Sequence, residues 1–379
     1  MTEVLDATSQ ITLEELLQTV ERRRDEFSAQ KFVSLDVIAE FKKAGIYRAA
    51  TPRRFGGDAL PPSQFLRVIE SISAVDASAG WVASFGSAVY LAALPVETQS
   101  ELYKDGPDVV FAGGLFPLQK AARGDGGWTV SGEWKFSSGC RGADIIGVGI
   151  AGGEGTQGKP LTALLRPEQV QIIENWDVLG LQGTGSNDLR VDGQFVPEAW
   201  TFVRGGEPTI DEPLFRYPAI AYAAQVLAAV NLGTGRAALD YAIRVGSGRT
   251  GITGAPKLAD RAYYRIDIAK AEAALLSARA FFYEISDEVY ATVESGDPAT
   301  DKQKALLRLA STHVAKVGAA AVQSAYTLCG TAAIYDASPM QRYLRDASVV
   351  TQHAFLGDGI YDGAGAVLMD TPPSIPAFI

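Results

Sequence analysis

The spacing of apolar residues changes twice along this chain of 379 residues. Near the N-terminus one helix face is marked by Leu13, Leu16, Leu17 and Val20, which recur three or four positions apart. Between about residues 109 and 202 the pattern becomes short β-rich runs with Gly-rich turns such as GDGG and AGGEGTQG. The remainder returns to long, alanine-rich helical patterns. Helices, then a sheet, then helices predict an α+β fold.

Local signals give the bounds of the expected elements. Thr12 and Glu15 predict a capping box before the first helix, and a second helix is expected between Ser34 and Gly45. A third helical pattern extends from Gln64 to about Ala93. A compact antiparallel sheet is expected from strands at 128–136, 144–150, 161–165, 170–173 and 189–196. Long helices rich in small residues, which indicate close helix packing, are expected at 218–245, 257–295 and 301–328.

Composition excludes several classes of protein. A net charge of −10 disfavours a surface that binds nucleic acid. No apolar run reaches the roughly 18 residues of a membrane helix, and the N-terminus MTEVLDATSQ does not resemble a signal peptide. A soluble, cytoplasmic protein is therefore expected. The only cysteines and histidines are Cys140, Cys329, His313 and His353, which form neither a disulfide framework nor a metal-binding pattern.

Three segments combine the residue types of a binding site. They are WTVSGEWKFSSG at Trp128–Gly139, WDVLGLQGTGSND at Trp176–Asp188, and SPMQRYLRDA followed by TQH at Ser338–His353. In the first two, aromatic rings and hydroxyl groups suit a planar, partly polar ligand such as an isoalloxazine ring. These side chains are Trp134, Phe136, Ser137, Ser138, Thr184 and Ser186. Two ordinary β-turns above buried tryptophans would have the same composition. Neither G-x-G-x-x-G after a strand nor G-x-x-x-x-G-K-[ST] is present, so a classical dinucleotide site is not expected.

His353 is the natural acid/base candidate because a histidine can exchange a proton near neutral pH. A single histidine can equally be structural or exposed. His313 lies in the apolar helical stretch RLASTHVAKVG, where a structural role is expected.

In this order, the three segments resemble the acyl-CoA dehydrogenase superfamily, and specifically its branch of two-component flavin-dependent monooxygenases. The FVPE sequence at Phe195–Glu198 and the AGIY and FGG sequences before Asp58 extend the resemblance over nearly the whole chain. The resemblance implies an N-terminal helical domain (1–108), a central β-barrel (109–212) and a C-terminal four-helix bundle (213–379), assembled as a homotetramer. It also implies a flavin between barrel and bundle.

The resemblance further assigns roles around the flavin. Ser138 is expected near its reactive N5–C4a edge, with Thr184 and Ser186 near its other polar atoms. Trp134, Phe136 and Ser137 complete the expected cofactor contacts. Arg249 is expected to reach the phosphates from an adjacent chain. The cofactor is expected to be reduced FAD or FMN, which with O₂ forms a C4a-hydroperoxyflavin.

The segment after RDA favours an oxygenase over a dehydrogenase. Acyl-CoA dehydrogenases resembling this chain use a carboxylate base there, whereas this chain has Gln352-His353-Ala354. We therefore expect His353 to be the catalytic base that deprotonates a phenol or accepts a ring N–H proton. Ser138, near the reactive edge of the flavin, is the second residue expected to serve catalysis. No nicotinamide-binding pattern is visible, so a separate NAD(P)H:flavin reductase is expected to supply reduced flavin.

The substrate is expected to be an aromatic or heteroaromatic small molecule. Some phenol-hydroxylating relatives carry a further histidine before the barrel, but FAGGLFP has none. This leaves indoles, polycyclic aromatics and oxidation at nitrogen or sulfur open, together with phenols. An acyl-CoA dehydrogenase or oxidase with its base elsewhere, and an inactive flavin-binding scaffold, are the remaining alternatives.

Overall fold

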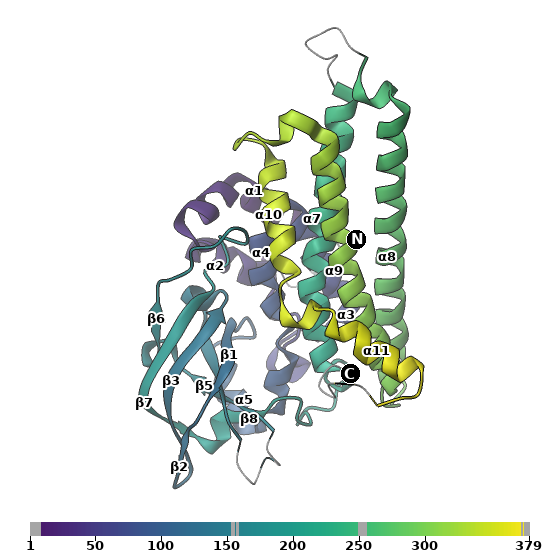
Figure 1. Cartoon of the computed structure of the whole chain (residues 1–379). Helices are drawn as coiled ribbons and strands as arrows, with labels where there is room; N and C mark the ends of the chain where they lie inside the picture. The colour runs from purple at the N-terminus through teal and green to yellow at the C-terminus, as the bar shows by residue number, and fades with distance from the viewer. Residues whose placement is uncertain (1–8, 153–155, 157–158, 249–255, 373, 375–379) are drawn as a thin grey trace. The chain divides into compact units, whose positions relative to one another are not determined.

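The computed structural model describes residues 9–152, 156, 159–248, 256–372 and 374 (Figure 1). Contacts divide the chain into two compact units. Unit 1 comprises Met1–Pro61, Val82–Val178 and Gln182–Ile220, and unit 2 comprises Pro62–Trp81, Leu179–Leu181 and Ala221–Ile379. The division into three domains expected from the sequence stays a prediction.

The N-terminal helices begin where their capping residues predict. The Thr12 hydroxyl accepts a hydrogen bond from the Glu15 amide, and the Glu15 carboxylate accepts one from the Thr12 amide. This confirms the capping box. Ser34 precedes the second helix, and Gly45 follows it with a φ of 79°. The helices of unit 1 are α1 (Leu13–Gln30), α2 (Leu35–Lys43), α5 (Val96–Leu102) and α6 (Pro213–Arg216).

The helical pattern expected from Gln64 to Ala93 is interrupted. The structure has α3 (Pro62–Val75), then α4 (Ala77–Ala83), then 3₁₀ turns. Asp76 separates the two helices, and its Oδ1 accepts a hydrogen bond of 2.8 Å from the Ala79 amide. Because aspartate competes for backbone N–H groups in this way, it favours the start of a new helix over continuation of the old one.

Unit 1 contains one eight-stranded sheet in the order β6-β7-β3-β1-β4-β5-β8, with β2 paired to β3. Its first and last strands are not paired to each other, so the described sheet is open and the expected closed barrel is corrected. The expected antiparallel arrangement is also corrected at β1, which pairs with β4 in parallel. The strands are β1 (Phe111–Gln119), β2 (Ala122–Gly124), β3 (Gly127–Ser137), β4 (Ile145–Ile150), β5 (Leu161–Leu165), β6 (Gln171–Ile173), β7 (Asn187–Pro197) and β8 (Thr201–Val203).

The strands β4 and β5 are buried on both faces of the sheet. Along β4, Ile146 and Val148 belong to one apolar cluster, while Ile145 belongs to another. This alternation follows from the two-residue period of a strand. β1 was not expected from the sequence because its glycines weaken the strand signal. Gly114 has a packing reason, since a Cβ there would lie 2.8 Å from the Trp134 Cβ.

Unit 2 is built from long helices that pack closely. A Cβ at Gly233 would lie 2.2 Å from the Glu70 carbonyl oxygen, and one at Gly318 would lie 2.3 Å from that of Asn231. Figure 1 shows α8 and α9 side by side along their length. Among the described residues, no helix is long and apolar enough to cross a membrane. These helices are α7 (Ala219–Gly248), α8 (Ala262–Glu294), α9 (Asp301–Cys329), α10 (Pro339–Val350) and α11 (Gly359–Leu368).

Candidate active site

Unit 1 joins the two Gly-rich turns in a buried cluster of hydroxyl groups. The Ser186 Oγ lies 2.6 Å from the Ser138 Oγ and 2.7 Å from the Thr184 Oγ1. The Gly139 amide donates a 2.8 Å hydrogen bond to the Thr184 carbonyl. All three hydroxyl-bearing side chains are at least 94% buried. The cluster forms because β3 ends beside the start of β7, where Ser137 pairs with Asn187.

Ser137 supplies a further polar group beside this cluster. Its side chain is completely buried, and its Oγ has no hydrogen-bond partner among the described residues. A buried hydroxyl without a partner is costly, and a bound polar molecule is one way to satisfy it. Ser137 therefore fits a ligand whose edge carries nitrogen and oxygen atoms, as a flavin does.

The two aromatic residues expected to stack on a ligand have different surroundings. Phe136 is 68% exposed and has a φ of 61°, and its ring lies edge-on to Trp176 with centroids 6.4 Å apart. Trp134 is 0% exposed, and its indole N–H donates a 2.7 Å hydrogen bond to the Gly149 carbonyl. Trp134 is thus a core residue without surface for stacking. Of the expected pair, Phe136 alone offers a ring face.

Cys140 is a packing residue of the apolar core of unit 1. The side chain is 1% exposed, and its Sγ lies 3.6 Å from the Gly185 carbonyl oxygen. Burial raises the pKa of the thiol to about 11. The thiol is therefore protonated at neutral pH and is a poor nucleophile.

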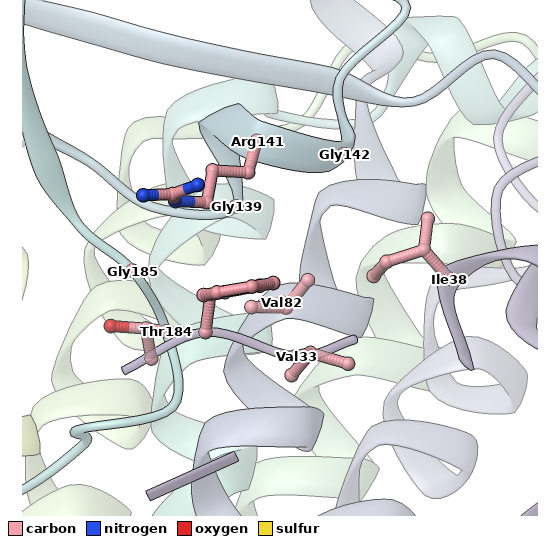
Figure 2. Close-up of a pocket in the computed structure, with 9 residues that line it drawn as sticks. Val33, Ile38, Val82, Gly139, Arg141, Gly142, Thr184 and Gly185 are labelled. Atoms are coloured by element: carbon pink, nitrogen blue, oxygen red, sulfur yellow. The ribbon is translucent and has the colours of Figure 1, made fainter. Parts of the chain in front are cut away.

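A small pocket lies beside the same turns (Figure 2). Apolar side chains of Val33, Ile38 and Val82 line it together with the backbone of Gly139 and Gly142. The guanidinium of Arg141 lies over the Phe32 ring, 4.7 Å from its centroid. Figure 2 shows Thr184 and Gly185 at its edge. The pocket lining is mainly apolar, so the hydroxyl cluster is the better match for the polar edge of a flavin.

His353 lies in unit 2, directly before the 3₁₀ turn Ala354–Leu356. Its Nδ1 accepts a 3.2 Å hydrogen bond from the Phe355 amide. The imidazole is half-buried between the rings of Trp81 and Phe355, whose centroids lie 5.7 and 5.1 Å away. Burial lowers the pKa of His353 to about 4. The imidazole is therefore neutral at pH 7, and its proton lies on Nε2 because Nδ1 is an acceptor.

A buried carboxyl group in unit 2 was missed by the sequence analysis. The Asp346 Oδ1 accepts a 2.6 Å hydrogen bond from the amide of Leu181, a residue held at a φ of 53°. Burial, and then the nearby Asp76, raise the pKa of Asp346 to about 7. A Cβ at Gly180 would lie 2.4 Å from the Arg345 carbonyl carbon. Asp346 thus fixes the backbone at Leu181, three residues before Thr184. Asp346 is the aspartate of the RDA motif, so that motif was the sequence signal that could have identified it.

Two further residues named in the sequence analysis are Arg249 and His313. Arg249 lies outside the described residues, so its expected role stays a prediction. His313 is half-buried on α9. No cluster of three metal-binding side chains occurs among the residues that the structure describes.

Comparisons with known proteins identify a matching family and similar enzymes. The family described as acyl-CoA dehydrogenase, C-terminal domain, matches residues 225–357. Two relatives are named indole-3-acetate monooxygenase. The one from Pseudomonas putida is 53% identical and covers 94% of this chain and 92% of its own. The one from Acinetobacter baumannii is 44% identical and covers 96% and 95%.

A solved structure shows the same fold. The crystal structure of 3-HSA hydroxylase from Rhodococcus sp. RHA1 covers 97% of this chain and 98% of its own, with a TM-score of 0.89 and 23% identity. The two monooxygenases align with 94% and 96% of this chain. The chain therefore belongs to the acyl-CoA dehydrogenase superfamily, in its branch of flavin-dependent monooxygenases that are oxygenase components of two-component aromatic hydroxylases.

Proposed function

We propose that this enzyme hydroxylates an indole bearing an acetate side chain, with indole-3-acetate as the first substrate to test. The identity of 53% to an indole-3-acetate monooxygenase over nearly the whole chain supports the substrate class. The observation that carries an oxygenase reaction is the state of His353. It lies in the segment where, by the resemblance, the dehydrogenases carry their carboxylate base, and its pKa of about 4 keeps it neutral.

The residues of the chain have distinct tasks in this proposal. Ser137, Ser138, Thr184 and Ser186 bind the polar edge of FAD or FMN, and Phe136 covers part of its ring. When bound, the reduced flavin and O₂ supply one oxygen atom to the substrate, and the second oxygen leaves as water. Trp81 and Phe355 limit access of water to His353.

The geometry of His353 changes the role proposed for it. Its Nδ1 is already occupied by the Phe355 amide, so the free position is the Nε2–H donor. His353 is therefore proposed to donate a hydrogen bond to an oxygen atom at the reacting centre. Removal of a substrate proton would require a charged imidazolium, which burial disfavours.

The decisive experiment measures oxygen incorporation. The purified enzyme is mixed with indole-3-acetate, ¹⁸O₂ and a flavin reductase that supplies reduced FAD or FMN. We expect a product that has gained one ¹⁸O atom by mass spectrometry. Absence of such a product with both flavins would overturn the proposal. Bleaching of oxidised flavin by acyl-CoA thioesters without O₂ would instead indicate a dehydrogenase.

We infer that a separate NAD(P)H:flavin reductase is the partner and that the enzyme forms a homotetramer with a C-terminal four-helix bundle. The apolar side chains Tyr263 and Ile266, each 51% exposed on α8, suit burial between copies of the chain. Light scattering is expected to give about four times the chain mass of 40.2 kDa. A monomer mass would contradict this assembly.

A further inference from the structure

Arg308 is a buried cation without an ion-pair partner among the described residues. It lies on α9, its side chain is 2% exposed, and its Nε and Nη1 atoms have no hydrogen-bond partner among the described residues. No ion pair in the described part of the chain includes it. Burial alone lowers the pKa of Arg308 to about 10, so the guanidinium stays charged at pH 7. An uncompensated charge in this environment is costly and calls for an anion.

Other half-buried arginines of unit 2 do have partners. Arg236 forms ion pairs with Asp240 and Glu272, and Arg279 forms one with Glu70. Arg308 is buried more deeply than either. The lack of an ion-pair partner for Arg308 within the described part of the chain is therefore a property of this position and not of the unit 2 helices in general.

The surroundings of Arg308 connect it to His353. Its guanidinium carbon lies 5.5 Å from the centroid of the Phe355 ring, and the Phe355 amide bonds to His353 Nδ1. One helical turn beyond Arg308, Thr312 is 0% exposed, and its Oγ1 also has no partner among the described residues. Residues four apart lie on the same helix face. Arg308 and Thr312 thus present unsatisfied polar atoms from one face of α9, and Arg308 contacts the ring of the residue whose amide bonds to His353.

We propose that Arg308, with Thr312, binds the carboxylate of the aromatic substrate. This inference rests on the proposed function and deepens it, because it names the group that selects an aryl acetate over a neutral arene. The guanidinium can hold both carboxylate oxygens at once, which a lysine cannot do. The Phe355 ring, whose centroid lies 5.5 Å from the Arg308 guanidinium carbon, offers an apolar surface against which the aromatic ring of such a substrate would pack.

Matched ligands test the assignment directly. Indole-3-acetate and indole-3-acetamide share a shape and differ in charge. We expect the wild-type enzyme to bind the acid at least about 10-fold more tightly by calorimetry. The variant Arg308→Met is expected to lose this preference while binding the amide as before. Its thermal stability without ligand should be unchanged or higher, because it removes an unpaired buried charge.

Two control variants distinguish a carboxylate site from a general effect of losing a buried arginine. Arg236→Met removes a paired arginine and is expected to lower stability while keeping the preference for the acid. Arg308→Lys keeps the positive charge but loses the planar guanidinium that binds both carboxylate oxygens. It should weaken binding of the acid by at least about 3-fold. Equal binding of the acid by wild type, Arg308→Met and Arg308→Lys would overturn the inference. So would a loss confined to flavin binding, which would assign Arg308 to the flavin phosphate.

The same variants separate this inference from the proposed function. If the wild type oxygenates both indoles but does not prefer the acid, the carboxylate site is wrong and the monooxygenase function stands. If the wild type binds the acid through Arg308 but oxygenates neither ligand, the proposed reaction is wrong and the anion site stands.

Discussion

At the scale of single residues, His353 combines a low pKa with one occupied nitrogen. The Phe355 amide fixes Nδ1 as an acceptor, and burial keeps the ring neutral. In the proposed function, the neutral histidine therefore acts through its Nε2–H group over the physiological pH range. The acidic limb of its contribution to activity should then fall near pH 4, well below the ordinary histidine pKa.

Two amide substitutions separate the functions of the two ring nitrogens. His353→Asn retains an acceptor near the Nδ1 position and loses the donor, whereas His353→Gln places an amide donor near the Nε2 position. We expect His353→Asn to reduce the rate of oxygenation by at least about 100-fold, with flavin affinity unchanged. His353→Gln is expected to retain more activity. Comparable rates for the two variants in single-turnover product assays would rule out the donor role.

At the scale of elements, the irregular end of β3 produces the proposed flavin contact. The pairing of β3 with β7 shifts register between Trp134 and Ser137. Phe136 adopts a positive φ within this irregularity. In a regular strand Trp134 and Phe136 would lie on the same face. The bulge turns Phe136 toward solvent while Trp134 stays in the core.

The serines at this strand end should respond differently to alanine. Ser137→Ala removes an unpaired buried hydroxyl, so the apo protein should keep or gain stability, while flavin binding should weaken. Ser138→Ala breaks the contact with Ser186 and should lower the free energy of unfolding by about 1 kcal/mol. Urea titration and flavin fluorescence measure the two effects. Unchanged flavin affinity in Ser137→Ala would remove Ser137 from the cofactor site.

At the scale of the whole molecule, two buried titratable groups shift stability in opposite directions with pH. The raised pKa of Asp346 stabilises the folded state at low pH, and this contribution is lost as the pH rises from about 4 to 7. The lowered pKa of His353 stabilises the folded state above about pH 6.5, and this contribution is lost as the pH falls toward 4. The two contributions oppose each other between pH 4 and 6.5.

Single variants should reveal each contribution. In Asp346→Asn, which keeps an acceptor for the Leu181 amide, unfolding free energy should increase with pH between 4 and 6.5 more steeply than in wild type. In His353→Asn it should decrease with pH over that range relative to wild type. The difference attributable to either group is at most about 3–4 kcal/mol. Urea titrations at several pH values measure these slopes, and parallel curves for all three proteins would contradict the assignment.

Local sequence signals were enough for most elements and for the grouping of the two serine-containing turns. The Thr12 capping box, the strand at Trp128–Phe136 and the helix from Asp301 depend on spacings of a few residues, which the sequence states directly. The residue types of FSSG and GTGS indicated a polar binding edge, and the β3–β7 pairing brings these turns together. Family membership also followed from the sequence motifs, and the close relatives confirm it.

Tertiary structure alone decided which of these side chains are buried, which atoms already have hydrogen-bond partners and which pKa values are shifted. The open sheet and the parallel β1–β4 pair depend on contacts between distant segments. The burial of Trp134, the occupied Nδ1 of His353 and the bond from Leu181 to Asp346 likewise depend on three-dimensional packing. Arg308 is the clearest case. An arginine in an apolar helix predicts a positive charge, but the sequence does not say whether an acidic side chain will pair with it. The burial of a side chain and the identity of its hydrogen-bond or ion-pair partners depend on the whole fold. The periodicity of residues along the chain therefore cannot predict them.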